Sequence, residues 1–256
     1  MPSRRNILLG GLLCASGGYA SCTCSVFAEQ VPQSKGCLLT ESDADRLYPA
    51  GAGIRTFVTG EESVISDSGD REFDRALART LAKCADMFSV LPGFAFYDDS
   101  RGMNAYATTR VRMDRTDGTV LMGKRMLRRL MNMPEAPDAC VAAVCAHEFG
   151  HILQFKRRLL PIVGAGQPTG KRVELQADFF AGYFAGVRKR ERSSFPAAVF
   201  AMTQYTFGDN MIDNPNHHGT QQERGQAVVQ GYLAAFEQKL NLSDAIERSI
   251  RYVKAM

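Results

Sequence analysis

The sequence predicts an α+β protein in which a small mixed sheet lies on a mostly helical body. The candidate strands come early in the chain and most of the candidate helices come late, an order that is typical of this class. There is no internal repeat, and 256 residues with 45% hydrophobic and 23% charged composition suit one globular domain.

The N-terminus has the pattern of an export signal. Arg4 and Arg5 precede an apolar run over residues 7–20, and the segment Val26–Ala28 places small residues at the −3 and −1 positions of a cleavage site. We therefore expect residues 1–28 to be a signal peptide of the twin-arginine type. An ordinary secretory signal that happens to hold two arginines is the alternative.

Export leaves two forms of the mature chain open. Cleavage after Ala28 gives a free periplasmic or secreted domain over residues 29–256. Residues 19–22 partly resemble a lipobox, although Tyr19 stands where leucine is expected, and this alternative gives a lipoprotein with a lipid anchor. No later apolar run is long enough for a transmembrane helix, and a net charge of +4 is too mild to indicate a nucleic-acid partner.

Periodicity places the elements of the first half. A polar, turn-rich entry is followed by one amphipathic helix and by four strand candidates that alternate or are rich in β-branched and aromatic residues. The entry is residues 29–52, the helix is 70–91, and the strands are 54–58, 93–97, 104–108 and 118–122.

The second half is predicted to be helical. Proline and glycine separate the helices, and the Gly/Pro-rich segment 161–170 is predicted to be a loop. The expected helices are a segment that ends near Met131, then 138–159, 171–190, 196–206, 220–239 and 242–254.

Four cysteines, Cys37, Cys84, Cys140 and Cys145, lie beyond the predicted signal. An exported protein can form disulfides, but spacing does not determine their pairing. Cys140 and Cys145 lie on one apolar helix, where buried thiols are the expected state.

The motif from His147 to His151, His-Glu-x-x-His, is the strongest chemical signal. Histidines at i and i+4 lie about 40° apart on a helix, so both can reach one ion. Neutral imidazole suits zinc, and Glu148 is placed to act as general base on water activated by the metal. The alternative is a pair of helix-surface histidines without a metal.

Zinc requires a third protein ligand, and the best candidate is Glu174 on the next helix. Asp178 lies four residues on and shares its face, so it can accept the N–H of a ligand histidine and fix its tautomer. A solvated acidic face is the alternative, although the flanking Ala177, Phe179 and Phe180 indicate burial.

These motifs resemble the bacterial neutral zinc metallopeptidase family, a gluzincin group whose third zinc ligand is a glutamate. The resemblance rests on His147–His151, on Glu174–Asp178 followed by Ala181–Gly182, and on the late stretch His218–Arg224. The segment Asn104–Ala107 is also similar to the strand that precedes the active helix in prenyl-protein and membrane-stress zinc endopeptidases.

The resemblance implies a zincin-like catalytic domain. It implies His147, His151 and Glu174 as zinc ligands, Glu148 as general base, and Asp178 as the residue that orients a ligand histidine. Two departures matter. The membrane families have transmembrane helices that this sequence lacks, and the region before residue 90 matches none of these patterns.

His218 has a physical case of its own. It precedes a helix in a Pro/Gly/Asn loop, from which it could fold back and donate a hydrogen bond to a developing oxyanion. The alternatives are a plain loop histidine or a cap built around Thr220. The family motif favours His218 over His217.

The segment Asn104, Ala105 and Tyr106 is a candidate substrate-binding strand. Peptidases of this type hold their substrate as an added strand through main-chain hydrogen bonds. An interior strand of the sheet is the alternative.

The sequence thus predicts an enzyme, an exported zinc metallopeptidase that hydrolyses protein or peptide substrates. Two alternatives stay open: a zinc-bearing envelope binding or assembly protein with a dormant site, and an amidase that acts on peptidoglycan stems. The sequence determines neither the cleavage specificity nor the oligomeric state.

Overall fold

The computed structural model describes residues 38–39, 62–112 and 116–256. The predicted signal peptide over residues 1–28 and the predicted strand over 54–58 lie outside these residues.

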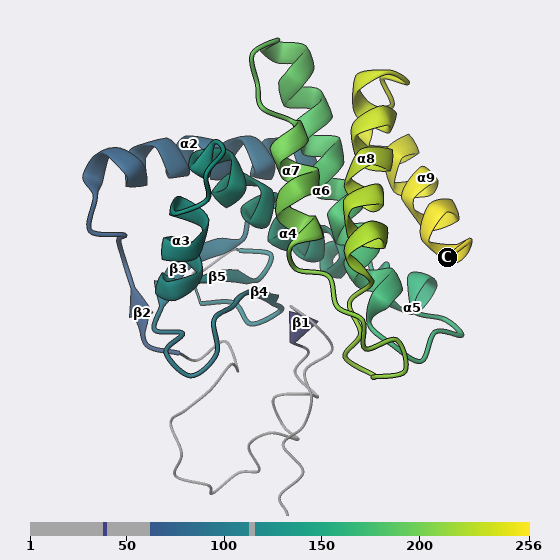
Figure 1. The fold of residues 1–256 in the computed structure, drawn as a ribbon, viewed down its shortest axis with the longest axis horizontal. Coiled ribbons are helices and arrows are strands. Elements are labelled where there is room, and N and C mark those ends of the chain that lie inside the picture. Colours follow the sequence, from purple (N-terminus) through teal and green to yellow (C-terminus); the bar gives the residue numbers. More distant parts are fainter. Residues whose placement is uncertain (1–37, 40–61, 113–115) are drawn as a thin grey trace, which may run out of the picture. The chain divides into compact units, whose positions relative to one another are not determined.

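The described residues form one mixed sheet and eight helices (Figure 1). In chain order the elements are β1 (Leu38–Leu39), β2 (Val64–Ile65), α2 (Arg71–Phe88), β3 (Gly93–Tyr97), β4 (Ala105–Thr108), β5 (Thr119–Gly123), α3 (Lys124–Met131), α4 (Pro137–Lys156), α5 (Leu160–Val163), α6 (Lys171–Glu191), α7 (Ala198–Tyr205), α8 (Gln221–Phe236) and α9 (Leu242–Lys254).

The sheet has the strand order β1-β4-β5-β3-β2. β4 and β5 pair antiparallel, with Tyr106 opposite Leu121, while β3 and β5 pair parallel. The two-residue strands β1 and β2 pair parallel with β4 and antiparallel with β3, respectively. The expectation of a small mixed sheet on a mostly helical body is therefore confirmed, although the two-residue strands β1 and β2 were not expected.

Helix α4 lies at the centre of the described fold. It packs against β4 and β5, against α2 and α3, and against α6 and α7 (Figure 1). Every side chain from Ala139 to Gln154 is buried. A helix that is apolar on all sides is stable only in such surroundings, so the polar groups of its motif are held inside the protein.

Glycines set the close helix crossings that bring the site together. A Cβ at Gly150 would lie 3.2 Å from both Ala177 Cα and Phe180 Cβ, so this residue allows α6 to approach α4. A Cβ at Gly182 would collide with the carbonyl oxygen of Val228. The backbones of α6 and α8 are therefore in direct contact.

Helix α4 ends earlier than the predicted Leu159. Arg158 adopts a left-handed conformation with φ of 53°, and the amide of Leu159 donates to the carbonyl of Gln154 at 2.9 Å. This hydrogen bond closes the helix as a C-terminal cap does. Helix α2, predicted to reach Leu91, likewise ends earlier, at Phe88, because Ser89 is left-handed with φ of 52°.

The prediction of a continuous loop over residues 161–170 was wrong at its start. α5 occupies Leu160–Val163, with Pro161 in its first turn, where proline costs no hydrogen bond. The buried Val163 anchors this turn. No helix within the described residues is both long enough and apolar enough to cross a membrane.

Three cysteines of the described part of the chain, Cys84, Cys140 and Cys145, are free and buried. The expectation of buried thiols at Cys140 and Cys145 is confirmed. Cys37 lies outside the described residues.

Candidate metal centre

Three buried side chains converge between α4 and α6. The Nε2 atoms of His147 and His151 lie 3.1 Å apart, and they lie 3.4 and 3.6 Å from the two carboxylate oxygens of Glu174. A tetrahedral ion with bonds of about 2.0–2.1 Å has neighbouring ligand atoms roughly 3.3 Å apart. The three groups therefore have the spacing of a site that could hold a metal ion.

The tautomer of His147 follows from its partner. Its Nδ1 lies 2.8 Å from Oδ1 of Asp178, which is fully buried. Asp178 also accepts two hydrogen bonds from Arg224, from Nε at 2.8 Å and from Nη2 at 3.0 Å. A carboxylate so paired is an acceptor only, so neutral His147 carries its proton on Nδ1 and directs the Nε2 lone pair at the site.

The tautomer of His151 follows from a chain of amides. Gln154 donates from Nε2 to the carbonyl of Val173 at 2.8 Å, so its oxygen is the atom 2.8 Å from His151 Nδ1. The same nitrogen lies 3.0 Å from the oxygen of Gln176, whose own amide donates to Ser249. His151 therefore donates from Nδ1 and also directs an Nε2 lone pair at the site.

Two lone pairs and one carboxylate thus face each other without a proton of their own. Burial alone would raise the pKa of Glu174, but a positive charge on the imidazoles of His151, His147 and His218, when they are protonated, holds the pKa of this carboxyl well below its usual range. Converging acceptors in a dry interior repel each other unless a cation lies between them. The arrangement is thus one that a bound cation stabilises.

Asp178 and Glu174 do not form a solvated acidic face. Both side chains are fully buried. Burial by itself would raise the pKa of Asp178, and the neighbouring Arg224 and His147 lower it. The two carboxylates take different positions: Glu174 lies beside the Nε2 atoms of both imidazoles, and Asp178 contacts Nδ1 of His147.

Glu148 lies beside the centre and outside the ligand set. Its side chain is buried, and its Oε2 has no hydrogen-bond partner within the described residues. Burial raises the pKa of Glu148 to about 7, and the carboxylate of Glu174 acts in the same direction. A carboxyl group with this pKa can both accept and release a proton near neutral pH.

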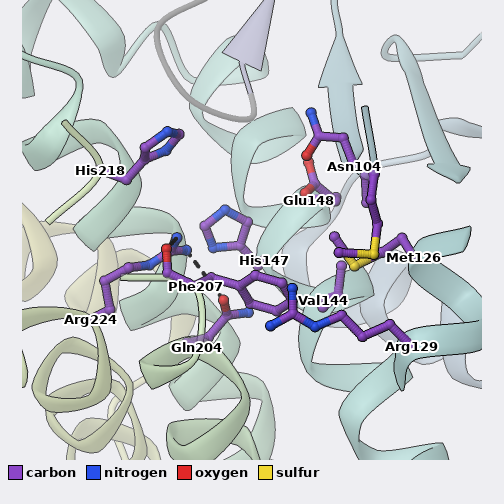
Figure 2. Close-up of a pocket in the computed structure, with 12 residues that line it drawn as sticks. Asn104, Met126, Arg129, Val144, His147, Glu148, Gln204, Phe207, His218 and Arg224 are labelled. Atoms are coloured by element: carbon purple, nitrogen blue, oxygen red, sulfur yellow. Dashed lines mark hydrogen bonds between the residues drawn. The ribbon is translucent and has the colours of Figure 1, made fainter. Parts of the chain in front are cut away.

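A cavity of about 180 Å³ opens on the centre and is lined by both His147 and Glu148. In Figure 2, Glu148 and Asn104 lie at one end of this cavity and His218 at the other, with His147 between them. Phe207 and Arg129 form another part of the wall. The imidazoles of His147 and His218, the amide of Asn104 and the carboxyl group of Glu148 therefore line the same cavity.

The structure distinguishes the two loop histidines. His217 is buried, with its Nδ1 2.6 Å from Asp209. His218 lines the cavity, is one-quarter exposed, and has its Nδ1 3.7 Å from the carboxylate of Glu174. Asp209 also accepts a hydrogen bond of 3.0 Å from the backbone N–H of His218. The carboxylate of Asp209 therefore positions both His217 and His218.

The proposed substrate strand is only partly at the cavity. Asn104 and Ala105 line it, whereas Tyr106 packs with Tyr97 and Leu121 in a separate buried cluster. The side chains alternate along β4, so Tyr106 points to the other face. Within the described residues, β4 lies between β1 and β5 in the sheet. Its pairing with β1 involves Ala107 and Thr108, the last two residues of β4.

Sequence reasoning gave no role to Arg224, Gln154 or Arg129. Arg224 ends the late family motif, which was a usable signal, and Gln154 lies three residues after His151 on the same helical face. Arg129 gave no signal, because its place in the cavity wall depends on how α3 packs on α4.

No protein-family model matches the chain, and no curated protein or solved structure matches it either. The interpretation of the site therefore rests on its geometry and on the sequence motifs.

Proposed function

We propose that the protein is a zinc metallopeptidase, a hydrolase of protein or peptide substrates with a zincin-like active site. The observation that carries the proposal is the convergence of His147 Nε2, His151 Nε2 and the Glu174 carboxylate in one buried cluster. Two imidazoles and one carboxylate are a ligand set of catalytic zinc sites, which use three protein ligands and keep one position open.

The oriented tautomers support zinc over harder cations. Imidazole nitrogen suits zinc and related transition metals, whereas magnesium and calcium prefer oxygen ligands throughout. Zinc bound here would supply Lewis acidity toward the substrate carbonyl and would lower the pKa of water.

Glu148 is the proposed general base. It accepts a proton from the attacking water and passes it to the nitrogen of the leaving amine. Its place in the cavity wall and its pKa of about 7 suit this exchange. Its buried Oε2, which has no partner within the described residues, is available for the incoming water.

His218 is the proposed donor to the oxyanion. It faces the cavity from the side opposite Glu148 and is partly exposed, so it can contact a substrate (Figure 2). Asn104 and Ala105 are the proposed main-chain contacts for an extended substrate. For Tyr106 the proposed contact is through the main chain alone, because its side chain is buried in the cluster with Tyr97 and Leu121.

The test is cleavage of an unfolded protein by the purified zinc-loaded protein and by Glu148→Gln, with zinc content measured in both. We expect the wild type to cleave and the variant to retain zinc without cleaving. If both hold zinc and neither cleaves protein, the peptidase proposal fails. A parallel assay on peptidoglycan stem peptides then separates the amidase from a dormant binding protein.

We also propose that the protein is exported, on the strength of Arg4, Arg5 and the apolar run that follows. N-terminal sequencing of the protein recovered from the periplasm should begin at Glu29. A lipid-modified N-terminus at Cys22 would favour the lipoprotein, and an intact cytoplasmic chain would contradict export.

A further inference from the structure

Arg129 places a cation in the wall of the cavity that opens on the candidate centre. It lies in the last turn of α3 and lines this cavity together with His147 and Glu148. Its guanidinium carbon lies 4.9 Å from the centre of the Phe207 ring. Figure 2 shows the guanidinium beside that ring, below His147 in this view.

The other cation of the cavity is already engaged. Arg224 is buried and is held by Asp178 through two hydrogen bonds. Arg129, by contrast, is exposed, and within the described part of the chain no ion pair joins it to a carboxylate. Its stacking on Phe207 restrains the side chain and leaves the N–H groups at the guanidinium edge available.

The surroundings of Arg129 favour an anionic group over a cationic one. Met103, Met126 and Val144 contribute apolar wall to the same cavity. An apolar wall lowers the local dielectric constant, which strengthens attraction to a carboxylate and makes a second cation unfavourable. The planar guanidinium can bind a carboxylate through two parallel hydrogen bonds.

We propose that Arg129 is a specificity-determining residue that selects substrates with a carboxylate close to the bond that is cleaved. This inference rests on the proposed peptidase function and names the substrate class of that same site. The carboxylate can be the side chain of an aspartate or glutamate, or the free C-terminus of a peptide. Both sources present the same group to the guanidinium, so peptides must distinguish them.

The experiment uses the zinc-loaded full-length mature protein and matched quenched fluorescent peptides. One series replaces Gln with Glu or Lys at each position around a fixed core, and a second series compares a free C-terminus with an amidated one. We expect kcat/KM to be about 10-fold higher for one carboxylate-bearing peptide than for its neutral partner, which is the size of a charge-assisted hydrogen bond at a partly exposed site.

Three variants assign the preference to Arg129. Arg129→Gln should abolish the preference, and Arg129→Glu should shift it toward the Lys peptide. Arg128→Gln is the matched control, because Arg128 is an exposed arginine on the same helical turn that does not line the cavity. It should keep the wild-type preference.

A second measurement separates this inference from the proposed function. Fluorescence anisotropy measures binding of the preferred labelled peptide to Glu148→Gln, and the addition of Arg129→Gln should weaken that binding about 10-fold. Cleavage that depends on Glu148 but shows no preference for a carboxylate, or a preference that survives Arg129→Gln, overturns the inference and leaves the peptidase intact. If nothing is cleaved, equal binding with and without Arg129 also overturns it.

Discussion

Arg224 donates two hydrogen bonds, of 2.8 and 3.0 Å, to the carboxylate of Asp178, and the same carboxylate lies 2.8 Å from Nδ1 of His147. The two residues are 46 positions apart in the sequence and both are buried. Arg224 is thus the outer member of a relay that fixes the tautomer and ring orientation of a candidate metal ligand.

Arg224→Ala should destabilise the protein by about 3–5 kcal/mol, because it leaves Asp178 buried without its cation. Chemical denaturation measures this loss. Arg251→Ala removes an exposed arginine of α9 that pairs with Glu247 at 3.7 Å, and it should change stability by less than about 0.5 kcal/mol. Equal effects of the two substitutions would contradict the buried relay.

Asp178→Asn should weaken zinc binding by roughly 10- to 100-fold, and because it leaves Arg224 buried without its carboxylate it should also lower the stability of the protein. The amide keeps the shape of the side chain but removes the charge that strengthens the His147 ligand. Competition with a chromogenic zinc chelator measures the affinity. Unchanged affinity would mean that Asp178 has no part in orienting a metal ligand.

Gly150→Ala should cost about 1–3 kcal/mol and weaken zinc binding, because the new methyl group forces α6, with Glu174, away from α4. Gly225→Ala is the matched control. A Cβ at Gly225 would meet its nearest neighbours at 3.6 Å, so this helical substitution should stabilise the protein by about 0.5–1 kcal/mol. A neutral Gly150→Ala would show that the crossing does not depend on this glycine.

Asp209→Ala should lower turnover by releasing His218, with zinc still bound. His218→Ala should lower kcat by about 100-fold or more if it contacts the oxyanion, and the double variant should lose no more than His218→Ala alone. Asp213→Ala, an exposed acid of the same loop, is the control. Additive losses would separate Asp209 from the action of His218.

Glu223 should make α8 sensitive to acid. Burial by itself would raise its pKa, but the backbone of Thr220 and the ammonium of Lys171 lower the pKa of this carboxyl. A folded pKa below the unfolded value of about 4.3 adds stability that is present above that value and is lost as pH falls through the folded pKa. Glu223→Gln keeps the capping box without the charge.

The difference in unfolding free energy between wild type and Glu223→Gln should therefore be constant from pH 6 to 8, at about 0.5–1 kcal/mol, and should shrink below about pH 4. Urea denaturation at each pH measures it. A difference that grows as the pH falls would contradict the lowered pKa.

The sequence by itself determined the parts of this protein that depend on local geometry. His147 and His151 lie on one helical face because four residues make about one turn, and Glu174 and Asp178 share a face for the same reason. The sequence likewise predicted α6, α9 and strand β3 close to their observed bounds. The short elements β1, β2 and α5 were not predicted, since two to four residues carry too little periodicity.

Only the tertiary structure decided which of these groups meet. Glu174 reaches the histidines because Gly150 lets two helices approach, and Arg224 reaches Asp178 because α8 lies in contact with α6. Arg129 faces the cavity because of the way α3 packs on α4. Contacts between residues distant in sequence depend on the packing of whole helices, and helix packing depends on side chains from several elements at once, which no local pattern records.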